Sequence, residues 1–123
     1  MNQQEYIKKA LRSESKDYKF QSTGDITPRI EHAVYGLVTE AGELLDAIKK
    51  AKIYGQKLDK VNVVEELGDI MWYMALFVDA LGTDFQKIWQ KNIQKLKLRY
   101  PEKYTDENAK LRDLEAERKV LEN

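Results

Sequence analysis

The stretch VVEELGDIMWYMALFVDAL, residues 63–81, decides the fold because apolar side chains occupy most of its positions. At about 100° per residue, a helix gathers most of them on one broad face. The members of this face are Val63, Val64, Leu67, Ile70, Met71, Met74, Phe77, Val78 and Leu81. Trp72 and Leu76 fall on the opposite side, which we expect to be buried as well. A helix that is apolar nearly all round must be surrounded by other helices, and a second copy of this short chain is the natural source of cover. We therefore predict a homo-oligomer.

Helix signals continue on both sides of this stretch. Thr27 and Pro28 are typical of a helix start, and Gly55 can take the left-handed conformation that ends a helix. The apolar face of this helix, which we expect to be core, carries Ile30, Val34, Leu37, Val38, Ala41, Leu44, Leu45 and Ile48. In all, the predicted helices cover residues 2–17, 27–54, 59–81, 83–100 and 106–121, with a capping box at Thr83 and Gln86 and a loop at residues 20–25.

These elements predict an all-α fold, because sustained strand alternation occurs nowhere in the sequence. We expect a four-helix-bundle-like core with a peripheral C-terminal helix. Residues 1–123 are expected to form a single domain. Its parts are an N-terminal helix and loop (1–28), a metal- and phosphate-binding helical core (29–100) and a peripheral C-terminal segment (101–123).

Composition excludes several classes of function. The 21 basic and 21 acidic residues balance, so no overall field draws the protein to nucleic acid or to anionic lipid. Cysteine is absent, which excludes disulfides and thiolate metal sites. The opening MNQQEYIKK has no secretory apolar region, and the longest apolar run is too short to span a membrane. We expect a cytoplasmic protein with no membrane or nucleic-acid partner.

Two pairs of acids interrupt the most apolar helices. Glu40 and Glu43 are three residues apart, as are Glu66 and Asp69. Such pairs arise roughly three or four times by chance in a chain of this composition, and most are solvated helix faces. In these two pairs, however, the first acid lies on the shoulder of the apolar stripe and the second lies one step outward. The small residues Gly36 and Ala47 beside the first pair are expected to leave room above the carboxylates.

If the two helices pack side by side, four carboxylates face one crevice. Two such charges about 4 Å apart repel by about 4 kcal/mol at an effective dielectric constant of about 20, so a positive group is expected between them. Lysine side chains are one candidate. The other is Mg²⁺, a hard cation that prefers oxygen ligands, with Mn²⁺ as a possible substitute. Softer metals are disfavoured, because His32 is the sole histidine and the paired Glu-x-x-His of di-iron bundles is missing. We interpret His32 as a polar surface or capping residue.

Other residues are candidates for binding an anionic substrate. Asn92, Lys95 and Arg99 share one face of the predicted helix at 83–100. Cations opposite a carboxylate-bound Mg²⁺ are what a triphosphate requires, although a solvated basic face is an equal alternative. Tyr73 follows Asp69 by four residues and projects from the acid side of its helix, where its ring could stack on a base or sugar. It could equally be part of the core.

Three segments together resemble a known family. GLVTEAGELLDAIKKA (36–51), YGQKLDKVNVVEELGDIMWYMA (54–75) and NIQKLKLRYPEKYTDENAKLRDLEAER (92–118) are similar to the MazG-like all-α nucleoside triphosphate pyrophosphohydrolases, especially the compact single-domain type of phages and bacteria. The family signature is Glu-x-x-Glu, a spacer and Glu-x-x-Asp. The resemblance implies Mg²⁺ on Glu40, Glu43, Glu66 and Asp69, and phosphate contacts from Asn92, Lys95 and Arg99. It also implies a nucleotide contact from Tyr73 and a homodimer or homotetramer.

The activity implied by this resemblance is hydrolysis of a nucleoside triphosphate between its α- and β-phosphates, giving a monophosphate and pyrophosphate. We expect a metal-assisted attack by water, with Glu43 or the neighbouring Glu65 as the base that accepts the water's proton. Two alternatives stay open at this point. One is a non-catalytic nucleotide-sensing oligomer, and the other is a structural helical oligomer. Base preference, sugar preference and physiological role do not follow from these motifs.

Overall fold

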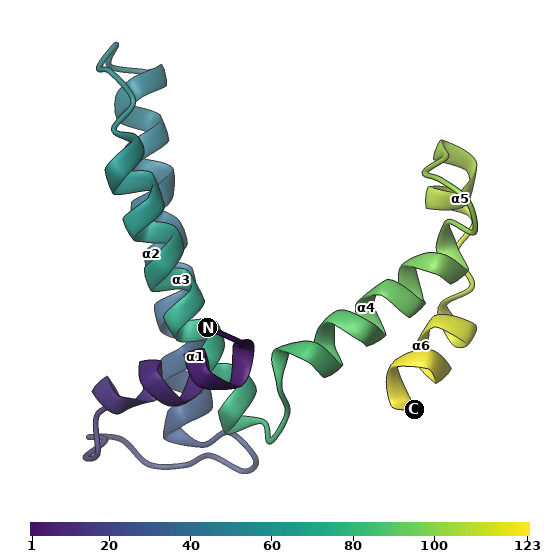
Figure 1. Cartoon of the computed structure of the whole chain (residues 1–123), viewed down its shortest axis with the longest axis horizontal. Coiled ribbons are helices and arrows are strands. Elements are labelled where there is room, and N and C mark those ends of the chain that lie inside the picture. The colour runs from purple at the N-terminus through teal and green to yellow at the C-terminus, as the bar shows by residue number, and fades with distance from the viewer. The chain divides into compact units, whose positions relative to one another are not determined.

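Helices account for all the regular structure, which confirms the all-α prediction. A computed structural model describes residues 1–123 as two compact units, Met1–Thr83 and Asp84–Asn123 (Figure 1). The first unit contains α1 (Gln3–Ala10), the 3-10 helix η1 (Leu11–Ser13), α2 (Pro28–Lys52) and α3 (Lys60–Ala80). The second contains α4 (Phe85–Arg99), α5 (Asp106–Lys110) and α6 (Leu114–Glu122). None of the helices combines the length and apolar composition needed to cross a lipid bilayer.

The α2–α3 pair is the framework of the first unit. Helix α2 begins as predicted, because Thr27 Oγ1 accepts a hydrogen bond from the Ile30 N–H at 3.3 Å and Pro28 needs no N–H partner. Asp59 caps α3 by accepting from the Asn62 N–H at 3.1 Å. Gly55 has a φ of +68° in the connection, which reverses the chain so that the two helices lie side by side (Figure 1).

The N-terminal helix covers the side of α3 that carries Trp72. The indole Nε1–H of Trp72 donates to the Ala10 carbonyl at 2.9 Å and to Ser13 Oγ at 3.0 Å. Leu76, on the same side of α3, is fully buried. The prediction that this side is covered is therefore confirmed, and α1 with η1 contributes part of that cover within a single chain.

The first helix is shorter than predicted, and the sequence after it is tied down by charge. Regular helix ends at Ala10 and the 3-10 turn ends at Ser13, because the Ser13 hydroxyl donates to the Ala10 carbonyl and Glu14 is extended. Arg29, at the start of α2, donates to the carboxylate of Glu14 and also to that of Asp79 at 2.7 Å. These hydrogen bonds raise the pKa of Arg29 and fasten the segment before α2 to both long helices.

Much of the apolar stripe remains exposed in the single chain. Val38 and Leu45 of α2 are 67% and 68% exposed, and Met71 of α3 is 53% exposed. The face of α2 that we expected to be core is thus uncovered over these positions, because the first unit supplies only one short helix beyond the α2–α3 pair. The homo-oligomer remains a prediction that would cover this surface.

Two details of the second unit differ from the sequence-based expectation. Helix α4 is capped by Asp84, whose carboxylate accepts from the Lys87 N–H at 2.9 Å, and not by the predicted box at Thr83 and Gln86. The C-terminal segment forms two helices, not one over 106–121. Asp113 starts α6 by accepting from the Ala116 N–H at 3.0 Å, which interrupts the helical run after Lys110.

A buried ion pair between Arg99 and Glu117 joins α6 to α4, and its contribution to folding stability is expected to depend on pH. Glu117 is 4% exposed, and hydrogen bonds from Arg99 and then Arg112 lower its pKa from 4.5 to about 2. A lowered folded-state pKa means that this contribution to stability is complete above about pH 4.5 and is lost as the pH falls towards 2. In acid titrations followed by NMR signals of α6, we expect Glu117→Gln to flatten the stability change across this window. Glu122→Gln, in an exposed pair with Arg118, should leave it unchanged.

Candidate functional site

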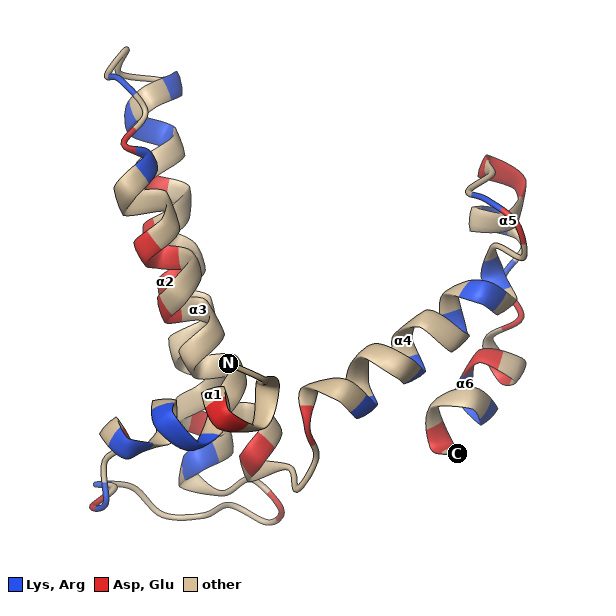
Figure 2. Cartoon of the chain, in the orientation of Figure 1, with Lys and Arg blue, Asp and Glu red and all other residues tan.

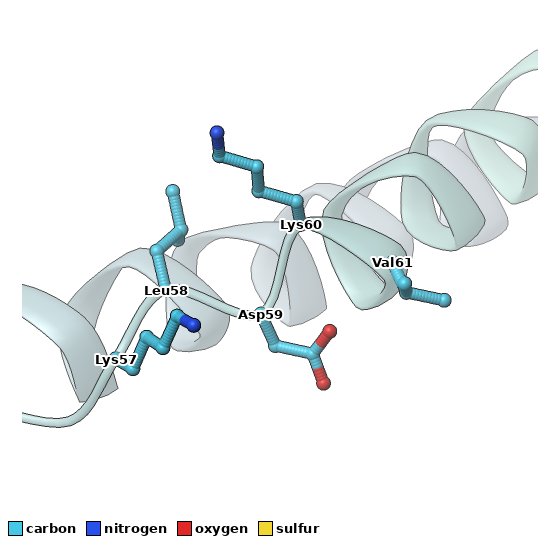
Figure 3. Close-up of a pocket in the computed structure, with 5 residues that line it drawn as sticks. All are labelled: Lys57, Leu58, Asp59, Lys60 and Val61. Atoms are coloured by element: carbon cyan, nitrogen blue, oxygen red, sulfur yellow. The ribbon is translucent and has the colours of Figure 1, made fainter.

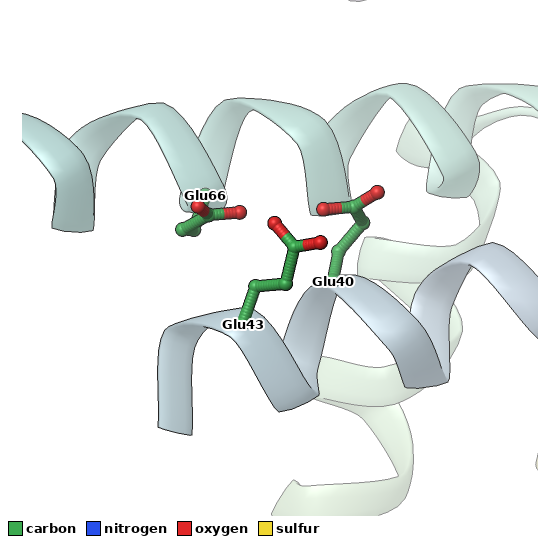
Figure 4. Close-up of side chains that lie close together, drawn as sticks. All are labelled: Glu40, Glu43 and Glu66. Carbon is green, nitrogen blue, oxygen red and sulfur yellow. The ribbon is translucent and has the colours of Figure 1, made fainter. Parts of the chain in front are cut away.

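Three of the four predicted acids converge between α2 and α3. Glu40 and Glu43 project from α2 and Glu66 projects from α3, with their carboxylates directed into the space between the helices (Figure 4). One oxygen from each lies within 4.8 Å of the others. This spacing is short enough for a single cation to contact all three residues, and no basic side chain is ion-paired to any of them.

Glu66 is the buried member of this group and is only half satisfied. Its side chain is 6% exposed. Oε1 accepts a hydrogen bond from Asn62 Nδ2 at 3.0 Å, whereas Oε2 is buried without a hydrogen-bond partner. A buried carboxylate oxygen without a partner is costly, and a divalent cation would satisfy it. The donor set, all carboxylate oxygens, is suited to a hard ion such as Mg²⁺.

The pKa values of Glu40 and Glu43 show that the neighbouring carboxylates repel one another. Burial raises the pKa of Glu40, and the charges of Glu43, Asp69 and Glu66 raise it further. The pKa of Glu43 is raised mainly by the charge of Glu66. Both carboxylates therefore resist ionisation in the metal-free protein, and a cation between them would reverse this effect.

Removing one of these charges should stabilise the metal-free protein. A raised folded-state pKa means that ionised Glu43 opposes folding at neutral pH and ceases to do so once it is protonated in acid. We expect Glu43→Gln to have a higher Tm than the parent at pH 7–8 in EDTA, with the difference vanishing below about pH 4.5. Asp46→Asn is the matched control, because Asp46 points outward and pairs with Lys50 at 2.9 Å. A higher Tm in Asp46→Asn as well would contradict repulsion within the cluster as the cause.

Asp69 and Tyr73 lie beside the three acids and line an adjoining hollow. This hollow has a volume of about 360 Å³ and is lined by Ser13, Glu40, Asp69, Trp72 and Tyr73. Asp69 is outside the group whose oxygens lie within 4.8 Å of one another, and its charge acts on both Glu40 and Glu43. Its role as a metal ligand therefore stays a prediction, as does the role of Tyr73 in binding nucleotide.

The space expected beside Gly36 is occupied. The aromatic ring of Tyr73 packs directly on this glycine, so closely that a Cβ at position 36 would overlap ring atoms Cε1, Cδ1 and Cζ. Burial, with the charges of Glu40 and Asp69, raises the pKa of Tyr73, so its hydroxyl remains protonated and able to donate a hydrogen bond.

Two neighbours of the site, Asn62 and Ser13, were missed in the sequence. Asn62 precedes Glu66 by one helical turn, and that spacing is a signal from which their hydrogen bond could have been predicted. Ser13 reaches the hollow only because Trp72 holds the end of η1, and no pattern links residues 59 positions apart. Glu65, the alternative base, is exposed and has the weakest of the effects that raise the pKa of Glu43.

The sequence suggested that His32 is a polar surface or capping residue. In the structure it lies inside α2, whose N-terminal cap is Thr27, and it is not fully exposed. It is half-buried, with edge-to-face contacts to the rings of Tyr18, Trp72 and Tyr73. Its Nδ1 lies 3.4 Å from the Tyr18 hydroxyl. His32 is therefore part of an aromatic cluster and lies outside the group of acids that could hold a metal.

The predicted phosphate contacts belong to the second unit. Asn92, Lys95 and Arg99 all lie on α4, whose basic residues follow one another along the helix in Figure 2. Asn92 is exposed and Lys95 is half-buried, whereas Arg99 is held by the Glu117 carboxylate. Their roles in binding substrate remain predictions.

Another hollow, of about 510 Å³, lies at the connection between α2 and α3 (Figure 3). It is lined by Lys57, Leu58, Asp59, Lys60 and Val61. Its one acid, Asp59, is already engaged as the cap of α3, so this hollow presents no converging set of metal ligands.

Comparison with known protein families matches the segment that contains the acid group. Residues 29–104 match the model of the MazG nucleotide pyrophosphohydrolase domain. Gene 37 protein of Mycobacterium phage L5 is 33% identical over 76 aligned residues, which cover 57% of this chain and 65% of the phage protein. The chain thus spans slightly less than two thirds of that curated relative. No solved structure gives a significant match.

Proposed function

Because the chain belongs to the MazG nucleotide pyrophosphohydrolase domain family, we propose that it is a Mg²⁺-dependent nucleoside triphosphate pyrophosphohydrolase. The reaction is hydrolysis of a ribo- or deoxyribonucleoside triphosphate between the α- and β-phosphates, which yields a monophosphate and pyrophosphate. The observation that carries this proposal is the unpartnered Glu66 Oε2, buried between two helices and accompanied by Glu40 and Glu43.

The residues present fit Mg²⁺, with Mn²⁺ as a substitute. Glu40, Glu43 and Glu66 would hold the ion, with Asp69 beside them as the fourth proposed ligand. When bound, the ion supplies a polarised water and neutralises phosphate charge. Asn62 orients Glu66 through its hydrogen bond to Oε1, which leaves Oε2 free to hold a cation.

Among these acids, Glu43 is the best placed to accept a proton. It is exposed, whereas Glu66 is buried and Glu40 is half-buried, so water reaches the Glu43 carboxylate most easily. Tyr73 lines the same hollow as Glu40 and would contact the nucleoside, and Asn92, Lys95 and Arg99 of α4 would bind the phosphates.

The exposed apolar face of α2 and α3 supports assembly of the chain with copies of itself. Val38, Leu45 and Met71 are each more than half exposed, and burying such side chains stabilises an interface by roughly 1.5–3 kcal/mol each. We propose a homodimer or homotetramer, which light scattering with size-exclusion chromatography would test. A monomer at micromolar concentration would contradict this part of the proposal.

The experiment that tests the activity is a panel of ribo-, deoxyribo- and modified triphosphates incubated with Mg²⁺, with the products separated by chromatography. The proposed function requires monophosphate and pyrophosphate from at least one substrate. Diphosphate with orthophosphate would refute the cleavage position. Tight triphosphate binding without turnover in Mg²⁺ or Mn²⁺ would support a nucleotide sensor in place of an enzyme.

A further inference from the structure

We propose that Arg112 binds phosphate groups of the substrate together with Lys95 and Arg99, and that Glu117 positions the two arginines for this task. The inference rests on the proposed function, which assigns Lys95 and Arg99 to the substrate phosphates. Arg112 and Glu117 lie beyond the matched residues 29–104, and the resemblance over residues 92–118 assigns no role to either of them.

One carboxylate receives two guanidinium groups in the second unit. Arg99 donates to Glu117 from Nε at 2.9 Å and from Nη2 at 3.1 Å. Arg112 donates to the same carboxylate from Nη2 at 2.7 Å and from Nε at 3.4 Å. Both arginines use their Nε–Nη2 edge. Each therefore keeps a second edge of N–H donors, formed by Nη1 and Nη2, that Glu117 does not occupy; the guanidinium of Arg99 also lies against Tyr100.

The cluster carries more positive charge than its carboxylate balances. Two guanidinium groups on one carboxylate leave a surplus of one positive charge, and no second acid is ion-paired to either arginine. A single arginine would be enough to satisfy Glu117 and hold α6 to α4. The second is available for an anion, and the Arg112 side chain is 40% exposed, so its Nη1–Nη2 edge reaches solvent.

Lys95 lies on the same side of α4 as this cluster. Lys91, Lys95 and Arg99 are spaced four residues apart and so share one face of the helix. Lys91 Nζ donates to the Leu121 carbonyl of α6 at 2.7 Å, and Arg99 bonds to Glu117 of α6, so this face is the one directed to α6. Lys95, between them, is half-buried and has no acid within ion-pair distance. A phosphate group would supply the missing anion.

Glu117 acts on phosphate through the arginines. Long arginine side chains lose conformational entropy when an anion fixes them, and two free guanidinium groups repel each other. Glu117, buried in the first turn of α6, holds both guanidinium groups before the ligand arrives. This pre-organisation lowers the cost of binding, so Glu117 is a positioning residue and not a competitor for Arg99.

The test is calorimetric titration of pyrophosphate into the full chain in EDTA, where the acid group holds no metal. Arg112→Gln keeps the Arg99–Glu117 pair and should fold, and we expect it to raise the Kd about tenfold, as loss of a charge-assisted hydrogen bond does. Arg118→Gln is the matched control, because Arg118 pairs with the exposed Glu122 on the same helix. Equal Kd values for Arg112→Gln and the parent would overturn the role of Arg112, as would absence of pyrophosphate binding by the parent.

Glu117→Gln decides between positioning and competition. We expect weaker pyrophosphate binding and a higher KM in Mg²⁺ turnover, whereas a tighter complex would show that Glu117 competes with the ligand. A lower Tm with an unchanged Kd would leave Glu117 a purely structural role and overturn the positioning claim. Glu43→Gln should bind pyrophosphate in EDTA as tightly as the parent, because Glu43 is not part of the phosphate site. A failure of the proposed enzymatic activity can therefore be distinguished from a failure of the phosphate site.

Discussion

Changing Glu66 to glutamine is expected to lower Mg²⁺-dependent pyrophosphate release by at least about 100-fold, beyond the roughly 10–100-fold cost of losing a residue that only supports a metal ligand. Glutamine has the same shape, and its carbonyl can still accept from Asn62 Nδ2. Its amide –NH₂ would then replace the unpartnered Oε2 and donate to the carboxylates of Glu40 and Glu43. The substitution thus removes a metal ligand while it satisfies the neighbouring acids.

For this reason the Glu66→Gln protein should remain folded and should be more stable than the parent in EDTA. Steady-state kinetics with the preferred triphosphate, together with circular dichroism melting curves, measures both effects. Glu43→Gln and Asp69→Asn are expected to lose activity as well. Asp46→Asn, which removes an outward-pointing acid of α2, should retain it. Full activity in Glu66→Gln would show that this carboxylate does not hold the ion.

The second large effect is a loss of folding stability when Gly36 is changed to alanine. A methyl group there would overlap the ring of Tyr73, so Gly36→Ala must either displace the ring or separate α2 from α3. Overpacking of this kind costs about 1–3 kcal/mol of unfolding free energy. Gly42→Ala is the matched control in the same helix, because open space surrounds position 42 and alanine there should stabilise the protein by about 0.5–1 kcal/mol.

A double-mutant cycle identifies Tyr73 as the group displaced. Once Tyr73→Ala has removed the ring, Gly36→Ala should no longer destabilise the protein, and denaturant unfolding of the four variants would measure the difference. If Tyr73 contacts the nucleoside, Gly36→Ala alone should also raise KM, because the displaced ring no longer lies beside Glu40. Additive stability effects of the two substitutions would contradict direct packing of Tyr73 on Gly36.

Capping residues and glycines in the sequence predicted several of the helix ends correctly. The start of α2 at Thr27 and Pro28 follows from capping, and the end of α3 near Gly82, with a φ of +68°, follows from the conformational freedom of glycine. The break before Asp113 and the early end of α1 were missed. In both, a side chain hydrogen-bonds to nearby backbone, an interaction that competes with helix and leaves no trace in the apolar periodicity.

The acid group was predictable to the extent that it depends on helix periodicity. Glu40 and Glu66 lie on the shoulders of two apolar stripes, and the packing of α2 on α3 brings these shoulders together while much of each stripe remains exposed. The hydrogen bonds that fix Ser13 and Arg99 were not predictable, because Trp72 and Glu117 are their partners through tertiary contacts. Likewise, no rule of spacing places the Tyr73 ring on Gly36.

The most direct test of the account is an anomalous difference map from crystals of the protein grown with Mn²⁺ in place of Mg²⁺. We expect a peak within coordination distance of Glu66 Oε2 and of oxygens from Glu40 and Glu43. A map without such a peak, in which Glu66 Oε2 is instead neutralised by a lysine or arginine, would contradict it.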